Sequence, residues 1–388
     1  MDKIKVLQVN KLYSPHIGGV ETIVQDIAEG LNDRVDMKVL VCQIKGKASV
    51  ENMNGVALYR AGSLGILFSM PLSFSFFSKL RKLSQDRDII HFHMPFPLGD
   101  AAYFLSGFKG KIIVWWHSDI IRQKSLMRVY KPLMDKFLKR ADCIIVATEG
   151  HINGSKYLAP YRSKCVIIPF GIDIRAITTV PRQISKQIPE LVPGQNSSQI
   201  TSGVNKVKKV LFIGRLIYYK GVDILLNAFS SVHGAQLYLA GDGPLRAQLE
   251  KQAKDLGIAK DVIFTGHVDN EQLKVLLNEC DMLVLPSVAN SEAFGLVQLE
   301  AMACSKPVIN TSLPTGVPYV SIHEKTGLTV PPGDAVELGK AMQRLIDHDK
   351  ERVQMGIHAK ARVMECFSLE KMLDSLFDLY QNIVEDTP

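Results

Sequence analysis

The sequence predicts an α/β protein with two domains, each built on a doubly wound parallel sheet, which face each other across a cleft. Three observations support this prediction. The 388 residues exceed what one compact core usually holds. Short apolar runs rich in β-branched residues alternate with helical patterns, which indicates strands covered on both faces. A stretch rich in Gln, Ser, Pro and Gly near the middle of the chain separates two such series.

The strand-like runs form two series, and both lack the strict alternation of half-exposed strands. The first reads IKVLQV, MKVLVC, DIIHFH, KIIVWWH, CIIVAT and CVIIPFG; the second reads KVLFIG, AQLYLAG, DVIFTG, MLVLP and KPVIN. We expect a first domain over residues 1–175, a linker and surface excursion over 176–206, and a second domain over 207–366. Apolar residues in 367–388 recur at helical spacing, which predicts a last helix packed back on the first domain.

Composition and the N-terminal residues favour an ordinary cytoplasmic protein. The chain begins with a strand pattern rather than an apolar signal core. Its six cysteines are scattered without a C-x-x-C pair, which is typical of reduced thiols. The longest apolar stretch, residues 64–77, is broken by Pro71 and falls short of the roughly 18 residues that a membrane span needs.

The net charge of +7 is concentrated in the first half of the chain, most densely over residues 109–140. A basic face on one half suggests an anionic partner for that half. No motif that reads DNA or RNA is present, so nucleic acid is not expected. The run SFSFFSKLRKL at 73–83 mixes aromatic and basic residues, which favours an anionic membrane surface or a lipid diphosphate. An ordinary solvated helix face is the alternative.

The first candidate binding segment, YSPHIGGVET, follows the first strand and precedes a helical pattern. Gly18 and Gly19 allow the backbone to approach a ligand closely, and the helix N-terminus offers free N–H groups to an anion. A plain strand-to-helix turn, which is common in α/β sheets, is the alternative. Neither the G-x-G-x-x-G fingerprint nor a Walker A pattern occurs.

The second candidate segment, LFIGRLIYYKG, opens the second series of strands. Arg215 and Lys220 lie just past a strand end, with Gly214 and Gly221 around them. A guanidinium that binds two oxygens in its plane, together with a compact ammonium, suits a diphosphate. Two unrelated surface cations are the alternative.

The third candidate segment, NSEAFGLVQLEAMA, predicts a loop followed by a helix that begins near Phe294 or Gly295. Glu292 falls in the loop, and Glu300 falls about two turns later, near the rim of the cleft. Carboxylates accept hydrogen bonds from vicinal hydroxyls such as those of a sugar or a ribose. The two acids and the two cations together predict a site for a sugar nucleotide.

These segments, with LAGDGP, FTGHV and TGLTVPPGD, resemble the retaining GT-B glycosyltransferases of family 4, from GGVE to PPGD. The resemblance implies two Rossmann-like domains and a hexosyltransferase. It implies that Glu292 contacts the donor sugar and that Glu300 binds the ribose. It also implies that the Arg and Lys of the second segment hold the diphosphate. Ser305 departs from the pattern, because the family usually has Gly there.

The resemblance assigns further donor-binding positions. The amides of Phe294, Gly295 and Leu296 would contact sugar hydroxyls and phosphate, and the region of His267 and Val268 would flank the base. No metal or other cofactor is implied.

Three histidines lie at or near strand ends of the first domain. By resemblance, His117 takes the position of the active-site histidine beside the donor sugar, with a structural role at the neighbouring loop as the alternative. His91 and His93 alternate on one strand and are interpreted as structural or acceptor-side residues, not metal ligands. The D-x-D triplet at 86–88 precedes its strand, away from the expected cleft, so we do not assign a metal to it.

The run WWHSDIIRQKS resembles mannosyl- and rhamnosyltransferases of bacterial surface polysaccharide assembly. The resulting hypothesis is a retaining transfer of mannose from GDP-mannose to a lipid-diphosphate-linked oligosaccharide in the synthesis of O-antigen, capsule or exopolysaccharide. The enzyme would work on the inner face of the cytoplasmic membrane as a peripheral protein. Alternatives are a UDP-sugar or dTDP-rhamnose donor, a nucleotide-sugar epimerase of the same architecture, and a non-catalytic sugar-nucleotide sensor.

Overall fold

The computed structural model describes residues 3–16, 18–67, 70–120, 124–179 and 207–385. The chain divides into an N-unit, Met1–Phe170 with Leu369–Pro388, and a C-unit, Gly171–Ser368. The sequence predicts the first boundary at 175/176, whereas the division into compact units falls at 170/171. Just past it, the N–H of Ile172 donates to the carbonyl of Phe367 at 3.0 Å, within the C-unit. Most of the predicted excursion, residues 180–206, lies outside the described residues.

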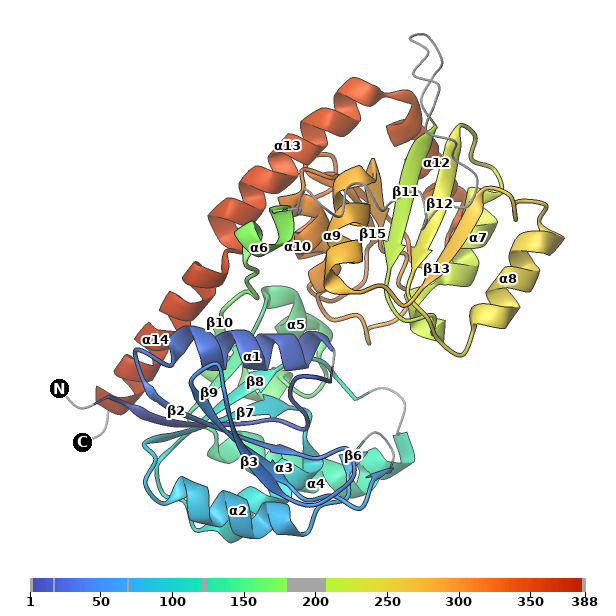
Figure 1. The fold of residues 1–388 in the computed structure, drawn as a ribbon. Coiled ribbons are helices and arrows are strands. Elements are labelled where there is room, and N and C mark those ends of the chain that lie inside the picture. Colours follow the sequence, from blue (N-terminus) through green and yellow to red (C-terminus); the bar gives the residue numbers. More distant parts are fainter. Residues whose placement is uncertain (1–2, 17, 68–69, 121–123, 180–206, 386–388) are drawn as a thin grey trace. The chain divides into compact units, whose positions relative to one another are not determined.

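The N-unit is built on an eight-stranded sheet in the order β10-β9-β8-β7-β1-β2-β4-β3, which is parallel except for the pair β3–β4 (Figure 1). Its strands are β1 (Lys5–Val9), β2 (Asp36–Cys42), β3 (Ser49–Met53), β4 (Val56–Ala61), β7 (Ile89–Met94), β8 (Lys111–Trp116), β9 (Cys143–Val146) and β10 (Cys165–Ile167). A separate hairpin joins β5 (Ile66–Leu67) to β6 (Met70–Pro71). The central strands β7 and β9 are buried along their whole length, as expected of a sheet covered on both faces.

Helices cover both faces of the N-unit sheet. They are α1 (Gly19–Leu31), α2 (Ser75–Ser84), α3 (Pro97–Ser106), α4 (Lys124–Arg140), α5 (Glu149–Gly154), the 3-10 helix η1 (Ala159–Lys164) and α14 (Leu369–Glu385). Side chains of α2, α3 and α4 form one core with Leu7, Phe92 and Trp116. On α14, Asp374 pairs with Arg34 just past α1 at 2.6 Å, and this contact brings the end of the chain back to the N-unit.

The C-unit holds a six-stranded parallel sheet in the order β13-β12-β11-β14-β15-β16. Its strands are β11 (Lys208–Ile213), β12 (Ala235–Ala240), β13 (Val262–Gly266), β14 (Met282–Val284), β15 (Val308–Thr311) and β16 (Gly327–Val330). Its helices are α6 (Ile174–Thr178), η4 (Tyr218–Lys220), α7 (Val222–Phe229), α8 (Arg246–Asp255), α9 (Asn270–Glu279), α10 (Leu296–Ala303), α11 (Val317–Val320), α12 (Ala335–Asp347) and α13 (Asp349–Cys366). Helices α7, α8 and α12 share the main core with the sheet, and α10 contacts β14 and β15.

Two Rossmann-like parallel-sheet units confirm the predicted fold class. Over the described residues, no helix is both long and apolar enough to cross a membrane.

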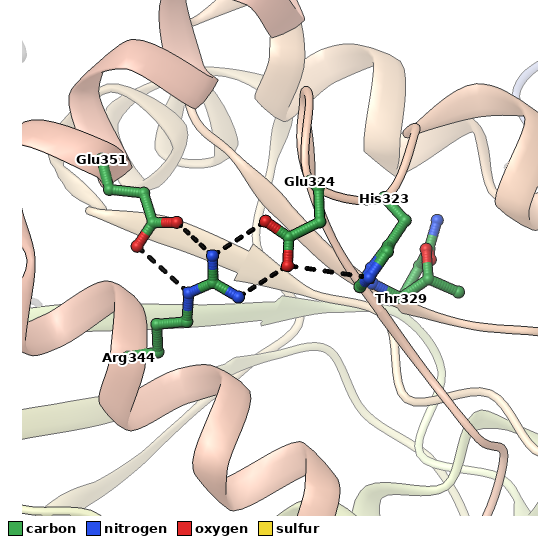
Figure 2. A network of polar contacts seen from close by, with 6 residues as sticks. His323, Glu324, Thr329, Arg344 and Glu351 are labelled. Atoms are coloured by element: carbon green, nitrogen blue, oxygen red, sulfur yellow. Dashed lines mark hydrogen bonds and ion pairs between the residues drawn. The ribbon is translucent and has the colours of Figure 1, made fainter.

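A set of ion pairs joins α12 of the C-unit to α13 and to the turn before β16 (Figure 2). Arg344 on α12 contacts both oxygens of Glu324 at 2.7 and 2.8 Å and also binds Glu351 on α13. His323 accepts from the N–H of Thr329 at 3.0 Å. Because the charged groups are already paired and remain partly exposed to water, this network stabilises the fold weakly and is not a candidate ligand site.

Candidate active site

Two loops of the C-unit meet where the strand order of its sheet reverses. Strand β11 lies between β12 and β14, so the loops after β11 and β14 leave adjacent carboxyl ends. The first loop carries Arg215 and Lys220, and the second carries Glu292. Ligands of doubly wound sheets bind at this switch point, because the two loops diverge there and leave room between them.

Lys220 and Glu292 form a buried ion pair between these loops. The Lys220 Nζ lies 2.6 Å from the Glu292 Oε2, and Glu292 is only 7% exposed. Burial is the largest single effect and acts to lower the pKa of Lys220, but the charge and hydrogen bond of Glu292 together with the charge of Tyr219 outweigh it, so the pKa of Lys220 is raised. The ammonium therefore stays charged at neutral pH and retains N–H groups that a phosphate can occupy.

The pair is oriented by Ser287, a residue not predicted from the sequence. Ser287 donates its hydroxyl to the same Oε2 of Glu292 at 2.9 Å. Among the described residues, the other oxygen of Glu292, Oε1, has no hydrogen-bond partner. That oxygen is thus available to a ligand hydroxyl. Ser287 could have been identified from the sequence, because it directly follows Pro286 beyond the end of a strand.

Gly221 lets the two loops approach each other. It adopts φ 65°, in the left-handed region, and forms the N-cap of α7. A Cβ at this position would lie 2.2 Å from the carbonyl oxygen of Pro286. Glycine is therefore required both by conformation and by space.

Arg215, the other predicted diphosphate cation, is exposed. Its positive charge lies near enough to Lys220 to act against the protonation of that residue.

Glu300 lies within α10 and keeps one buried carboxyl oxygen, Oε2, without a hydrogen-bond partner in the described part of the chain. Burial raises the pKa of Glu300 to about 7, because the charged form is poorly solvated there. Glu300 as a whole residue is half-buried, and its predicted place near the rim of a cleft stays a prediction. A ligand that brings hydroxyl groups to Oε2 would supply the missing donors.

We expect the stability of the protein to fall as pH rises through the titration of Glu300. The folded state binds this proton up to about pH 7, whereas the unfolded chain releases it near 4.5. Between these values the folded state holds more protons, so the free energy of unfolding falls with rising pH. Glu300→Gln should remove this slope, with a gain of at most about 3 kcal/mol over wild type between pH 5 and 8. Urea unfolding at both pH values measures the difference, and parallel pH dependence in the two proteins would contradict it.

The remaining predicted donor residues of the C-unit surround the start of α10 and the end of β13. Gly295 is the N-cap of α10 at φ 74°, so the helix begins at Leu296 and its first two amides have no acceptor within the helix. The Phe294 ring is buried and meets Phe367 edge to face at 6.0 Å. His267 is exposed and Val268 is half-buried, directly after β13. The structure leaves the base-flanking role of these last two residues as a prediction.

Gly18 and Gly19 belong to the N-unit and open α1. A Cβ on Gly18 would lie 2.3 Å from the Glu21 Oε2, so the carboxylate of Glu21 folds over this turn. The predicted anion position at the start of α1 therefore faces a carboxylate of the same helix. An anionic ligand at this turn requires the flexible Glu21 side chain to move aside.

His117 follows β8 of the N-unit and is 5% exposed. Its ring stacks on Phe170 at 5.4 Å and on His93 at 5.1 Å, nearly parallel to both. Burial lowers the pKa of His117 to about 3, and neighbouring positive charges act in the same direction. The imidazole is therefore neutral at physiological pH. His91 and His93 are both buried, and His91 bonds the Tyr380 hydroxyl at 2.7 Å.

The acidic triplet before β7 has structural partners. Asp86 pairs with Arg87 at 2.7 Å and with Lys38 at 3.1 Å, and Asp88 accepts from the N–H of Lys5 at 2.8 Å. These contacts lie at the amino end of the sheet. Among the described residues, no three His, Cys, Asp or Glu side chains lie together in a way that could hold a metal ion.

Comparison with known families and proteins gives matches along most of the chain. The family described as Glycosyltransferase Family 4 matches residues 17–176, and the family described as Glycosyl transferases group 1 matches residues 195–362. Together the two matched stretches contain every predicted site residue.

Two relatives match nearly end to end. A D-rhamnosyltransferase of Pseudomonas aeruginosa is 33% identical over 369 residues, which cover 94% of this chain and 92% of the relative. The O-antigen chain mannosyltransferase C of Escherichia coli is 29% identical over 385 residues, which cover 98% and 99%. Among solved structures, the sucrose-phosphate synthase from Thermosynechococcus elongatus superposes with a TM-score of 0.79 at 21% identity, covering 99% of this chain and 100% of that one. At this identity the superposition shows the fold alone.

Proposed function

This chain belongs to the GT-B glycosyltransferases, with a family 4 domain followed by a group 1 domain, and on that basis we propose that it moves a hexose, with retention of configuration, from a nucleotide sugar to a lipid-diphosphate-linked oligosaccharide. The observation that supports this proposal best is the buried Lys220–Glu292 pair at the switch point. The ammonium of Lys220 suits a diphosphate, and the unpaired carboxylate oxygen of Glu292 suits a sugar hydroxyl. A single site can therefore bind both the diphosphate and the sugar of a sugar nucleotide.

The proposed transfer proceeds on one face of the sugar. The bond between the anomeric carbon and the diphosphate oxygen breaks, and the acceptor oxygen bonds to the same face. The acceptor proton passes to the leaving phosphate oxygen. Arg215 and Lys220 stabilise the charge that develops on the diphosphate, a contribution commonly of several kcal/mol per group. Because the two cations neutralise the leaving group, the proposal includes no metal or other cofactor.

GDP-mannose is the proposed donor, in the synthesis of O-antigen, capsule or exopolysaccharide. The relative from E. coli, an O-antigen chain mannosyltransferase, supports this choice. A 6-deoxyhexose donor is the second candidate, because the P. aeruginosa relative is a D-rhamnosyltransferase at higher identity.

A lipid-linked acceptor places the N-unit at the inner face of the cytoplasmic membrane in this proposal. The segment around the β5–β6 hairpin exposes large apolar side chains: Leu64 is 70% exposed and Phe74 is 81% exposed. Helix α2 follows at once and exposes Arg81 and Lys82. Apolar side chains next to basic ones suit a surface of anionic lipid.

Incubation of the purified protein with labelled GDP-mannose, dTDP-rhamnose and UDP-glucose, with and without membrane lipid extract, tests the proposal. We expect mannose label to move into the lipid fraction only when extract is present. An altered sugar that stays on its nucleotide would instead indicate an epimerase. Binding of the nucleotide sugar without turnover on any extract would indicate a sensor.

A further inference from the structure

The residues behind His117 form a series of hydrogen bonds across the N-unit sheet. Gln8 lies on β1 and His93 on β7, and His117 follows β8; these three strands are neighbours in the order β8-β7-β1. The Gln8 Nε2 lies 3.0 Å from the His93 Nε2, and the His93 Nδ1 lies 2.8 Å from the His117 Nε2. All three side chains are buried, so water does not compete for these bonds.

The orientation of the Gln8 amide sets the direction of the whole series. Its nitrogen faces His93 and donates, so the His93 Nε2 accepts, while the Gln8 Oε1 is buried without a hydrogen-bond partner among the described residues. A neutral imidazole that accepts at one nitrogen carries its proton on the other, so the His93 Nδ1 donates. The His117 Nε2 must then accept, which leaves the proton of neutral His117 on Nδ1.

Protonation of His117 is opposed by the same arrangement. A proton on the His117 Nε2 would point at the N–H of His93, with no acceptor between the two nitrogens. Rotation of the ring cannot relieve this conflict cheaply, because Phe170 and Trp115 stack on it at 5.4 and 6.0 Å. Among the described residues, the His117 Nδ1 has no hydrogen-bond partner, so its N–H is left for a ligand.

We propose that Gln8 and His93 are positioning residues that hold His117 in the tautomer with its proton on Nδ1, so that His117 serves as a fixed, neutral hydrogen-bond donor to an uncharged ligand oxygen. His117 then acts neither as general base nor as general acid. This inference rests on the proposed function for the identity of the ligand, but the tautomer itself is a property of the free protein.

The test is nitrogen NMR of the full-length protein with ¹⁵N-labelled histidine rings, in the absence of substrate. Signals are assigned by single substitution of each histidine. We expect Nδ1 of His117 to give a pyrrole-type signal and Nε2 a pyridine-type signal, unchanged from pH 6 to pH 9. A protonated Nε2, a mixture of tautomers or a doubly protonated ring would overturn the proposal.

Gln8→Met tests the role of the first residue with little change of volume. We expect His117 to lose its single tautomer and transfer to fall on the order of tenfold, as for one lost hydrogen bond. Tyr380→Phe is the matched control: it removes a buried hydrogen bond of 2.7 Å to His91 in the same stack but leaves the series untouched. The control should keep the wild-type tautomer.

An unchanged His117 tautomer in a folded Gln8→Met protein would overturn the positioning role. Should this variant fail to fold, the wild-type spectrum alone still decides the tautomer. A correct tautomer in a protein that transfers no sugar would refute the proposed function and leave the hydrogen-bond series in place, so the two failures are distinguishable.

Discussion

Glu292→Gln is expected to lower the rate of sugar transfer by at least about 100-fold. The carboxylate at this position has two tasks, to accept from a ligand hydroxyl and to neutralise Lys220 at 2.6 Å. Gln keeps the shape but loses the charge, so the diphosphate cation and the sugar contact are both disturbed. Initial rates with a nucleotide-sugar donor and lipid extract measure the effect. Near-normal turnover of the purified variant would show that the role assigned to Glu292 is wrong.

The same substitution should reduce the stability of the protein by about 3 kcal/mol, because it leaves a buried ammonium without its partner. Glu292→Gln combined with Lys220→Met removes both charges, and we expect stability to recover while the transfer rate stays at least about 100-fold below that of the wild type. Glu279→Gln is a matched control, since Glu279 pairs with Lys209 at 2.8 Å at the amino end of the same sheet. That variant should keep its transfer rate.

Gly221→Ala is expected to disturb both stability and catalysis. The added methyl group would lie 2.2 Å from the Pro286 carbonyl, in a residue held at φ 65°. The two loops must separate, which moves Lys220 away from Glu292. We expect a loss of about 3 kcal/mol or more in the free energy of unfolding and a fall in transfer of at least tenfold. Urea unfolding and initial rates measure the two effects.

Gly257→Ala separates backbone strain from the steric conflict. Gly257 adopts φ 74°, close to the value of Gly221, but nothing lies within 4 Å of a Cβ built there. The cost should therefore be only about 1–2 kcal/mol, with no change in transfer. Equal losses in the two variants would mean that the contact with Pro286 has no effect.

The sequence alone identified the two-domain parallel-sheet architecture, because fully buried strands leave long apolar runs that alternate with helical patterns. It also placed Arg215, Lys220 and Glu292 past strand ends, where the chain order of strands and helices already predicts a site. The departure at Ser305 was visible as well, but only the structure shows that this residue adopts φ 59°, where glycine is preferred.

Contacts between residues far apart in the chain were decided by the tertiary structure alone. Lys220 and Glu292 are 72 positions apart, and no local pattern indicates that they form a pair or that Ser287 completes it. The series from Gln8 to His117 likewise depends on strand order, because three strands distant in sequence become neighbours in the sheet. Local sequence specifies the periodicity of helices and strands and the places where the chain turns. The protonation and the partners of a buried polar group depend instead on the distant groups that packing places within hydrogen-bond distance of it.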